Sequence, residues 1–89
     1  MITEKEKEVI AYYAQKYKVS SVLLFGSSLE KDSKPNDIDI GVKGIEAGVF
    51  FKFYGELIKH LSRPIDLVDL SQETLFTQLV EKNGVRIYG

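Results

Sequence analysis

The sequence predicts one small α/β (α+β) domain in which helices pack on a three-stranded β-sheet. Its 89 residues suffice for one domain with its own core and are too few for two. Apolar types make up 44% of the chain, well above the content of a disordered segment. Helical and strand patterns follow in the order helix, strand, short helical turn, strand, helix, strand, helix, which favours a mixed α/β arrangement.

A first helix is expected to begin after Thr3 and to run to about Lys18. Thr3 and Glu6 have the spacing of a capping box, in which each side chain accepts a hydrogen bond from the other residue's backbone amide. Apolar and aromatic residues then recur at helical spacing from Val9 to Tyr17. The mixed Glu and Lys run is typical of a solvated helix face, so we assign it no function.

Two strands are expected around a polar loop. The segment from Ser21 to Phe25 is almost entirely apolar, which predicts a strand buried on both faces that ends at Gly26. Residues 27–36 are rich in turn-forming types and are expected to contain a short helical turn at 28–30. From Asp37 to Val42 polar and apolar residues alternate, which predicts a strand with both of its aspartates on one face.

A second helix is expected to start at about Ala47 and to stop just before Pro64. Its apolar residues repeat at helical intervals. Aromatic side chains on one helical face belong to a core far more often than to a base-stacking platform, so we interpret this stripe as core. It consists of Phe50, Phe51, Phe53, Tyr54, Leu57, Ile58 and Leu61.

The C-terminal part predicts a third strand and a third helix. The strand is expected from Ile65 to Leu70, and Ser71 is expected to cap a helix that continues to about Lys82. Gly84 is a helix-ending residue. The apolar residues 85–88 suit a short strand or an extended tail.

Charge and composition exclude several classes of function. With 12 Lys and Arg against 13 Asp and Glu, the formal net charge is −1, which provides no basic field for coating long nucleic acid. The chain has no Cys, so disulfides, thiolate zinc sites and cysteine nucleophiles are excluded. No apolar stretch approaches the roughly 18 residues that a membrane span needs, and the N-terminus has no signal-peptide pattern. We therefore expect a cytoplasmic protein without a membrane partner.

The residues that suggest chemistry follow the first strand and lie on the second. A glycine directly after a buried strand lets the backbone turn sharply, and the amides beyond Gly26 can then point at phosphate oxygens. Asp37 and Asp39 place their side chains about 7 Å apart on one strand face, near the span that holds two divalent ions roughly 3.5 to 4 Å apart. The pattern predicts a phosphate-binding turn beside a pair of carboxylates.

The third strand offers a third carboxylate for such a site. Asp66 lies near the start of this strand, which is an unusual place for a charge. Asp69 is expected on the opposite face, beside Ser71, where a helix-entry role is natural. We therefore choose Asp66. Three carboxylates in a chain without Cys suit Mg²⁺ better than zinc.

Each aspartate also has an ordinary structural explanation. Asp37 could end the preceding turn, Asp39 could be the outward residue of an amphipathic strand, and Asp66 could pair with Arg63. The occurrence of all three together with the glycine turn favours a functional site.

The combination resembles the minimal nucleotidyltransferase family of the DNA polymerase β superfamily. The resemblance rests on Gly26-Ser27, a loop of nine residues, Asp37-x-Asp39 between apolar residues, and the later Asp66. These motifs are fairly specific in combination.

The resemblance covers residues 22 to about 70 and implies the nucleotidyltransferase fold, with a small mixed three-stranded sheet and helices packed on it. Residues 1–89 would then form a single minimal nucleotidyltransferase domain. The family often has an Arg and a second Gly after the Gly-Ser pair, whereas residues 28–31 of this chain read Ser-Leu-Glu-Lys.

The activity that the resemblance implies is transfer of a nucleoside monophosphate, in the first place AMP from ATP, to an acceptor hydroxyl with release of pyrophosphate. Two Mg²⁺ ions would neutralise the phosphates and lower the pKa of the acceptor hydroxyl. The nucleotide-binding residues would be Gly26, Ser27 and Ser28. The catalytic and metal-binding residues would be Asp37, Asp39 and Asp66.

The biological setting that the resemblance implies is a toxin and antitoxin pair. Minimal members are often encoded beside a small helical HEPN-type protein, and the nucleotidyltransferase is then the antitoxin, which adenylylates the toxin. The acceptor site would come from this partner or from a second copy of the chain in a homodimer. The alternative is a binding module that neutralises or scaffolds a helical partner without catalysis, which an exposed apolar patch would favour.

Overall fold

The computed structural model describes residues 2–26 and 37–89, and these form three helices and four strands. The expected helical turn at 28–30 lies outside the described residues. The elements in chain order are α1 (Glu4–Lys16), β1 (Ser21–Leu24), β2 (Ile38–Lys43), α2 (Ala47–His60), β3 (Ile65–Asp69), α3 (Leu75–Asn83) and β4 (Val85–Tyr88).

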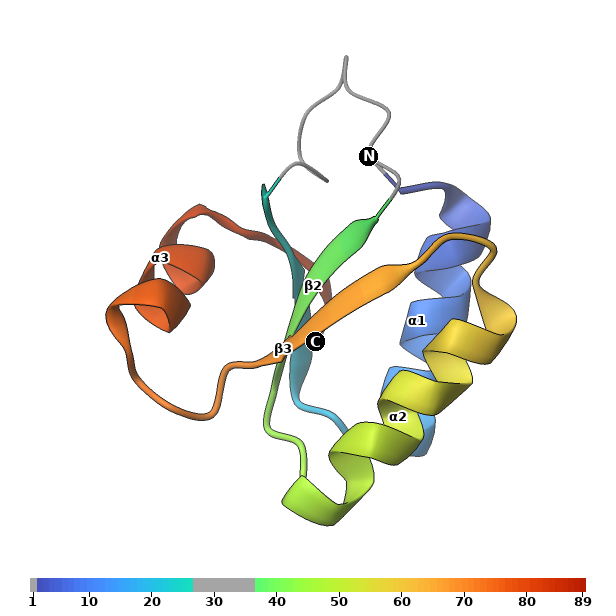
Figure 1. The fold of residues 1–89 in the computed structure, drawn as a ribbon, viewed down its shortest axis with the longest axis horizontal. Helices are drawn as coiled ribbons and strands as arrows, with labels where there is room; N and C mark the ends of the chain where they lie inside the picture. The colour runs from blue at the N-terminus through green and yellow to red at the C-terminus, as the bar shows by residue number, and fades with distance from the viewer. Residues whose placement is uncertain (1, 27–36) are drawn as a thin grey trace.

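The strands form one mixed sheet in the order β3-β2-β1-β4. β2 and β3 are parallel, whereas β1 runs antiparallel to both β2 and β4. The α/β fold class is therefore confirmed, but the prediction of three strands is wrong by one, because residues 85–88 pair with β1. Helices α1 and α2 cover one face of this sheet and α3 covers the other (Figure 1).

The larger core lies between the sheet and the α1–α2 pair. Phe53 and Leu57 of α2 are fully buried there, together with Ile38 and Ile40 of β2. The aromatic stripe of α2 is only partly core, because Phe51 is 77% exposed. The prediction is wrong for that residue and for the exposed Ile58, since the apolar residues of α2 occupy more of its circumference than one face can bury.

The start of α1 agrees with the sequence pattern. The Thr3 hydroxyl accepts a hydrogen bond from the Glu6 amide at 3.1 Å, and the Glu6 carboxylate accepts one from the Thr3 amide at 2.8 Å. The buried Glu6 carboxylate also accepts two hydrogen bonds from the Arg63 guanidinium, at 2.8 and 2.9 Å. These bonds from Arg63, followed by the bond from the Thr3 amide, lower the pKa of Glu6 against the opposing effect of burial.

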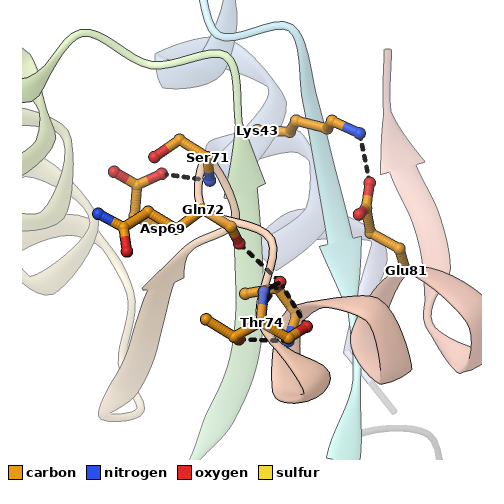
Figure 2. Close-up of polar contacts among 7 residues, drawn as sticks. Lys43, Asp69, Ser71, Gln72, Thr74 and Glu81 are labelled. Atoms are coloured by element: carbon orange, nitrogen blue, oxygen red, sulfur yellow. Dashed lines mark hydrogen bonds and ion pairs between the residues drawn. The ribbon is translucent and has the colours of Figure 1, made fainter.

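Helix α3 begins later than the sequence predicts. Its cap is Thr74, whose hydroxyl accepts a hydrogen bond from the Thr77 amide, while the Thr77 hydroxyl accepts one from the Thr74 amide. The predicted cap, Ser71, instead donates its amide to the Asp69 carboxylate at 2.9 Å, as Figure 2 shows. The prediction of Ser71 is wrong because Asp69 forms a local turn that delays the helix.

Contacts between α3 and the sheet are few. Leu23 of β1, Leu70 after β3 and Val80 of α3 form a small second core. An ion pair between Lys43 of β2 and Glu81 also connects this helix to the sheet (Figure 2). In the described part of the chain, no helix has the length and apolar character needed to cross a membrane.

Candidate active site

Two aspartates stand side by side on the face of the sheet that α3 covers. Asp39 of β2 and Asp66 of β3 are direct partners in the parallel register. Each lies between residues that are buried in the larger core on the opposite face, Ile38 and Ile40 for Asp39, and Ile65 and Leu67 for Asp66. Since successive strand residues point to opposite faces, both carboxylates lie on the α3 side.

The end of β1 brings a glycine turn against this pair. The Phe25 amide donates a hydrogen bond to the Asp39 carbonyl at 3.0 Å, which fixes the end of β1 beside Asp39. The next residue, Gly26, has a φ of 65°, as the predicted sharp turn requires. A Cβ at Gly26 would lie 2.8 Å from the Asp39 Oδ2 atom, so a larger residue here would have to displace this carboxylate.

The remaining predicted site residues fall into two groups. Asp37 is exposed and lies directly before β2, two positions ahead of Asp39. Ser27 and Ser28 lie outside the described residues. The structure thus brings together Asp39, Asp66 and Gly26.

The structure also separates Asp69 from Asp66. Alternation along β3 places Asp69 on the opposite face, as expected, but its carboxylate accepts the Ser71 amide in a turn before α3 rather than at the start of the helix. The guanidinium of Arg63, the alternative partner considered for Asp66, forms an ion pair with Glu6 at 2.8 Å.

The paired carboxylates suit a magnesium ion that is bound together with a phosphate. Among residues 2–26 and 37–89, no three His, Cys, Asp or Glu side chains form a cluster that could hold a metal by itself. Mg²⁺ usually takes one or two protein carboxylates and completes its shell with water and substrate phosphates. Like charges at paired strand positions repel, and a divalent cation would offset the repulsion between Asp39 and Asp66. The donor set therefore fits this metal.

Sequence reasoning missed a contribution from α3. A pocket beside Gly26 is lined by Phe76, Leu79 and Asn83 of this helix. These residues have the spacing i, i+3 and i+7, which puts them on one helical face. This spacing could have indicated a shared surface, but only the tertiary structure places that surface next to the glycine turn.

The chain is similar in sequence and in fold to known proteins. The family profile described as "Polymerase beta, Nucleotidyltransferase" matches residues 7–89. A solved structure described as a toxin-antitoxin with AMP-PNP is 28% identical, with a TM-score of 0.75, over 93% of this chain and 73% of that chain. A structure of the toxin-antitoxin MntA-HepT is 26% identical, with a TM-score of 0.72, over 98% of this chain and 73% of that one.

A third similar structure is a mutant of such a toxin-antitoxin complex in which two aspartates, two positions apart, are changed to glutamate. It is 26% identical, with a TM-score of 0.75, and the match covers 93% of this chain and 73% of that chain. The comparison with curated proteins finds no match.

Proposed function

Because the chain belongs to the polymerase beta nucleotidyltransferase family, we propose that it transfers a nucleoside monophosphate from a triphosphate to an acceptor hydroxyl. The observation that carries this proposal is the pairing of Asp39 with Asp66 on adjacent parallel strands beside the turn at Gly26. The donor that we propose is ATP, since a similar structure is described with its analogue AMP-PNP. Pyrophosphate leaves in this reaction.

The roles of the residues follow from their placement. Asp39 and Asp66, with Asp37 ahead of them on the chain, would hold two Mg²⁺ ions against the nucleotide phosphates. When bound, these ions neutralise phosphate charge and lower the pKa of the acceptor hydroxyl. The backbone turn at Gly26, which lies against Asp39, is proposed to bind the triphosphate, and Ser27 and Ser28 are proposed to continue that binding turn.

The acceptor that we propose is a HEPN-type helical toxin in the cytoplasm, with this chain as the antitoxin. Two similar structures, 26% and 28% identical, are described as toxin-antitoxin complexes. The chain also exposes large apolar side chains that a protein partner could cover. Among them are Tyr12 of α1, 62% exposed, and Phe51 of α2, 77% exposed.

The proposal is tested by transfer of label from ATP that is radioactive at its α-phosphate to a co-encoded HEPN-type protein in the presence of Mg²⁺. We expect transfer by the wild type and by Asp69→Asn, whose aspartate lies on the other face of the sheet. Asp39→Asn should transfer at least about a hundredfold more slowly, because it removes a carboxylate charge at the metal site. A chelator should abolish transfer by the wild type.

Far-UV circular dichroism of the two variants supplies the control for folding. Normal transfer by a folded Asp39→Asn would refute the proposed site, and an unfolded Asp39→Asn would show that the carboxylate is structural.

A second candidate function is a binding module that neutralises a helical partner without catalysis. An apolar patch on and beside α3 favours it, comprising Leu75, Phe76, Leu79 and Val85, each more than half exposed. Under this function Asp39→Asn neutralises the partner as well as the wild type does. Under nucleotidyl transfer, the same variant fails to neutralise it.

A further inference from the structure

A pocket of about 230 Å³ opens between the end of β1 and α3. Phe25 and Phe76 form its aromatic part, with ring centroids 5.9 Å apart and ring planes at 82°. Leu79 and Val80 add apolar surface, and Asn83 contributes the one side-chain amide in the lining. The pocket is therefore mainly apolar with one polar group, which is typical of sites for small organic molecules.

This pocket adjoins the candidate active site at Gly26. Gly26 lines the pocket, and its backbone also lies against the Asp39 carboxylate. Phe25 is paired with Asp39 through its amide, and its side chain packs on the small core under α3. Gly26 and Phe25 thus connect the neighbourhood of Asp39 to the pocket, so a ligand held at both would span these two residues.

Size and charge decide which part of a nucleotide suits the pocket. Sites for complete drug-sized ligands measure about 300 to 1,000 Å³, so this smaller pocket suits a single ring system. Asn83 is the last residue of α3 and Gly84 is its C-cap, which places the carbonyl end of the helix here. The partial negative charge at this end disfavours a phosphate. Phe76 is 51% exposed, which leaves ring surface for a ligand.

We infer that this pocket is the nucleobase site of the chain. The Phe76 ring stacks on the base, because aromatic rings bind the faces of bases. The Asn83 amide both donates and accepts hydrogen bonds, which matches the edge of adenine. The inference rests on the proposed function, since phosphates held at Gly26 and Asp39 anchor the other end of the nucleotide.

The test is calorimetric titration with two probes, Mg²⁺-ATP and Mg²⁺ with inorganic tripolyphosphate, which has no base. Phe76→Leu keeps apolar bulk but removes the ring. It should bind ATP about tenfold more weakly and tripolyphosphate as tightly as the wild type does. Phe51→Leu is the matched control, because it removes an exposed ring on α2 away from the pocket, and it should change neither affinity.

The two probes separate the base site from the proposed function. If Phe76→Leu binds ATP like the wild type, or loses the same factor for both probes, the base site is refuted while the phosphate and metal site stands. If the wild type binds neither probe, the proposed function is refuted and the base site with it. A loss of ATP affinity in Phe51→Leu equal to that in Phe76→Leu would also overturn the inference.

Discussion

The two faces of the sheet differ in how much they bury and in what they carry. Toward α1 and α2, the described residues include a cluster of 14 buried apolar side chains, whereas the cluster toward α3 has three. The sparsely packed face carries Asp39, Asp66 and the turn at Gly26. The comparison indicates that the first face supplies most of the stability, which leaves the second face free to place like charges side by side.

Because successive strand residues point to opposite faces, a single strand can contribute to the core on one face and to the candidate site on the other. In β2, Ile38 and Ile40 are fully buried against the helices, while Asp39 between them points to the other side. The same residues that fix the register of β2 and β3 therefore also fix the pairing of Asp39 with Asp66. The packing of the core and the placement of the two carboxylates are thus linked through the register of β2 and β3, and not through contact between the two groups.

The largest expected difference between the faces appears when the same change is made on each. Leu57→Ala, in the larger core, should lower the free energy of unfolding by about 4 kcal/mol, because it leaves a cavity in close-packed surroundings. Leu70→Ala, in the small core, should cost about 2 kcal/mol, since fewer neighbours surround it. Urea denaturation followed by circular dichroism measures the free energy of unfolding of both variants. Equal losses would contradict the unequal contribution of the two faces to stability.

The ion pair of Glu6 with Arg63 belongs to the helical side and should affect stability in a pH-dependent way. The pKa of Glu6 is lowered below its ordinary value of 4.5, so the stabilisation is present above that pH and is lost as the pH falls through the lowered pKa. Glu6→Gln should cost about 2 kcal/mol at pH 7.

Denaturation of both proteins across the acid range checks this expectation. The difference between wild type and Glu6→Gln should shrink as the pH falls below 4.5. Glu8→Gln, an exposed change on the same helix, is the control and should have little effect at any pH. A difference for Glu6→Gln that stays constant down to pH 2 would show that the carboxylate charge is not responsible.

A pair of glycine substitutions gives the smallest effects on stability and contrasts the site with a helix. Gly26→Ala should cost about 1 to 2 kcal/mol and weaken ATP binding, because of its positive φ and its contact with Asp39. A Cβ at Gly55 in α2 meets nothing within 4 Å, so Gly55→Ala should stabilise by about 0.5 to 1 kcal/mol. Thermal unfolding and ATP titration of both variants measure the contrast, and a Gly26→Ala as stable as the wild type, or a Gly55→Ala less stable than the wild type, would contradict it.

Local patterns predicted the elements that local interactions determine. The capping box of Thr3 and Glu6 and the alternation around Asp39 involve neighbouring residues, and both appear as expected. The choice of Asp66 over Asp69 also followed from alternation, and the parallel register places Asp66 beside Asp39. The assignment of these residues to metal binding stays a prediction.

Other features depend on contacts that are distant in sequence. The local sequence of residues 85–88 suited either a short strand or an extended tail, and pairing with the edge of β1 decides for the strand. Ser71 and Thr74 are both favoured N-cap types, and the turn formed by Asp69 decides between them. The pocket between Gly26 and α3 likewise requires the packing of α3 on the sheet.

The pairing of carboxylates on the α3 face is tested most directly by titrating ATP with Mg²⁺ into the wild type, Asp66→Asn and Asp69→Asn. We expect binding to the wild type that a chelator abolishes, retention of that binding in Asp69→Asn, and its loss in Asp66→Asn. Binding by Asp66→Asn that equals the wild type, or equal losses in the two variants, would contradict a nucleotide and metal site on this face.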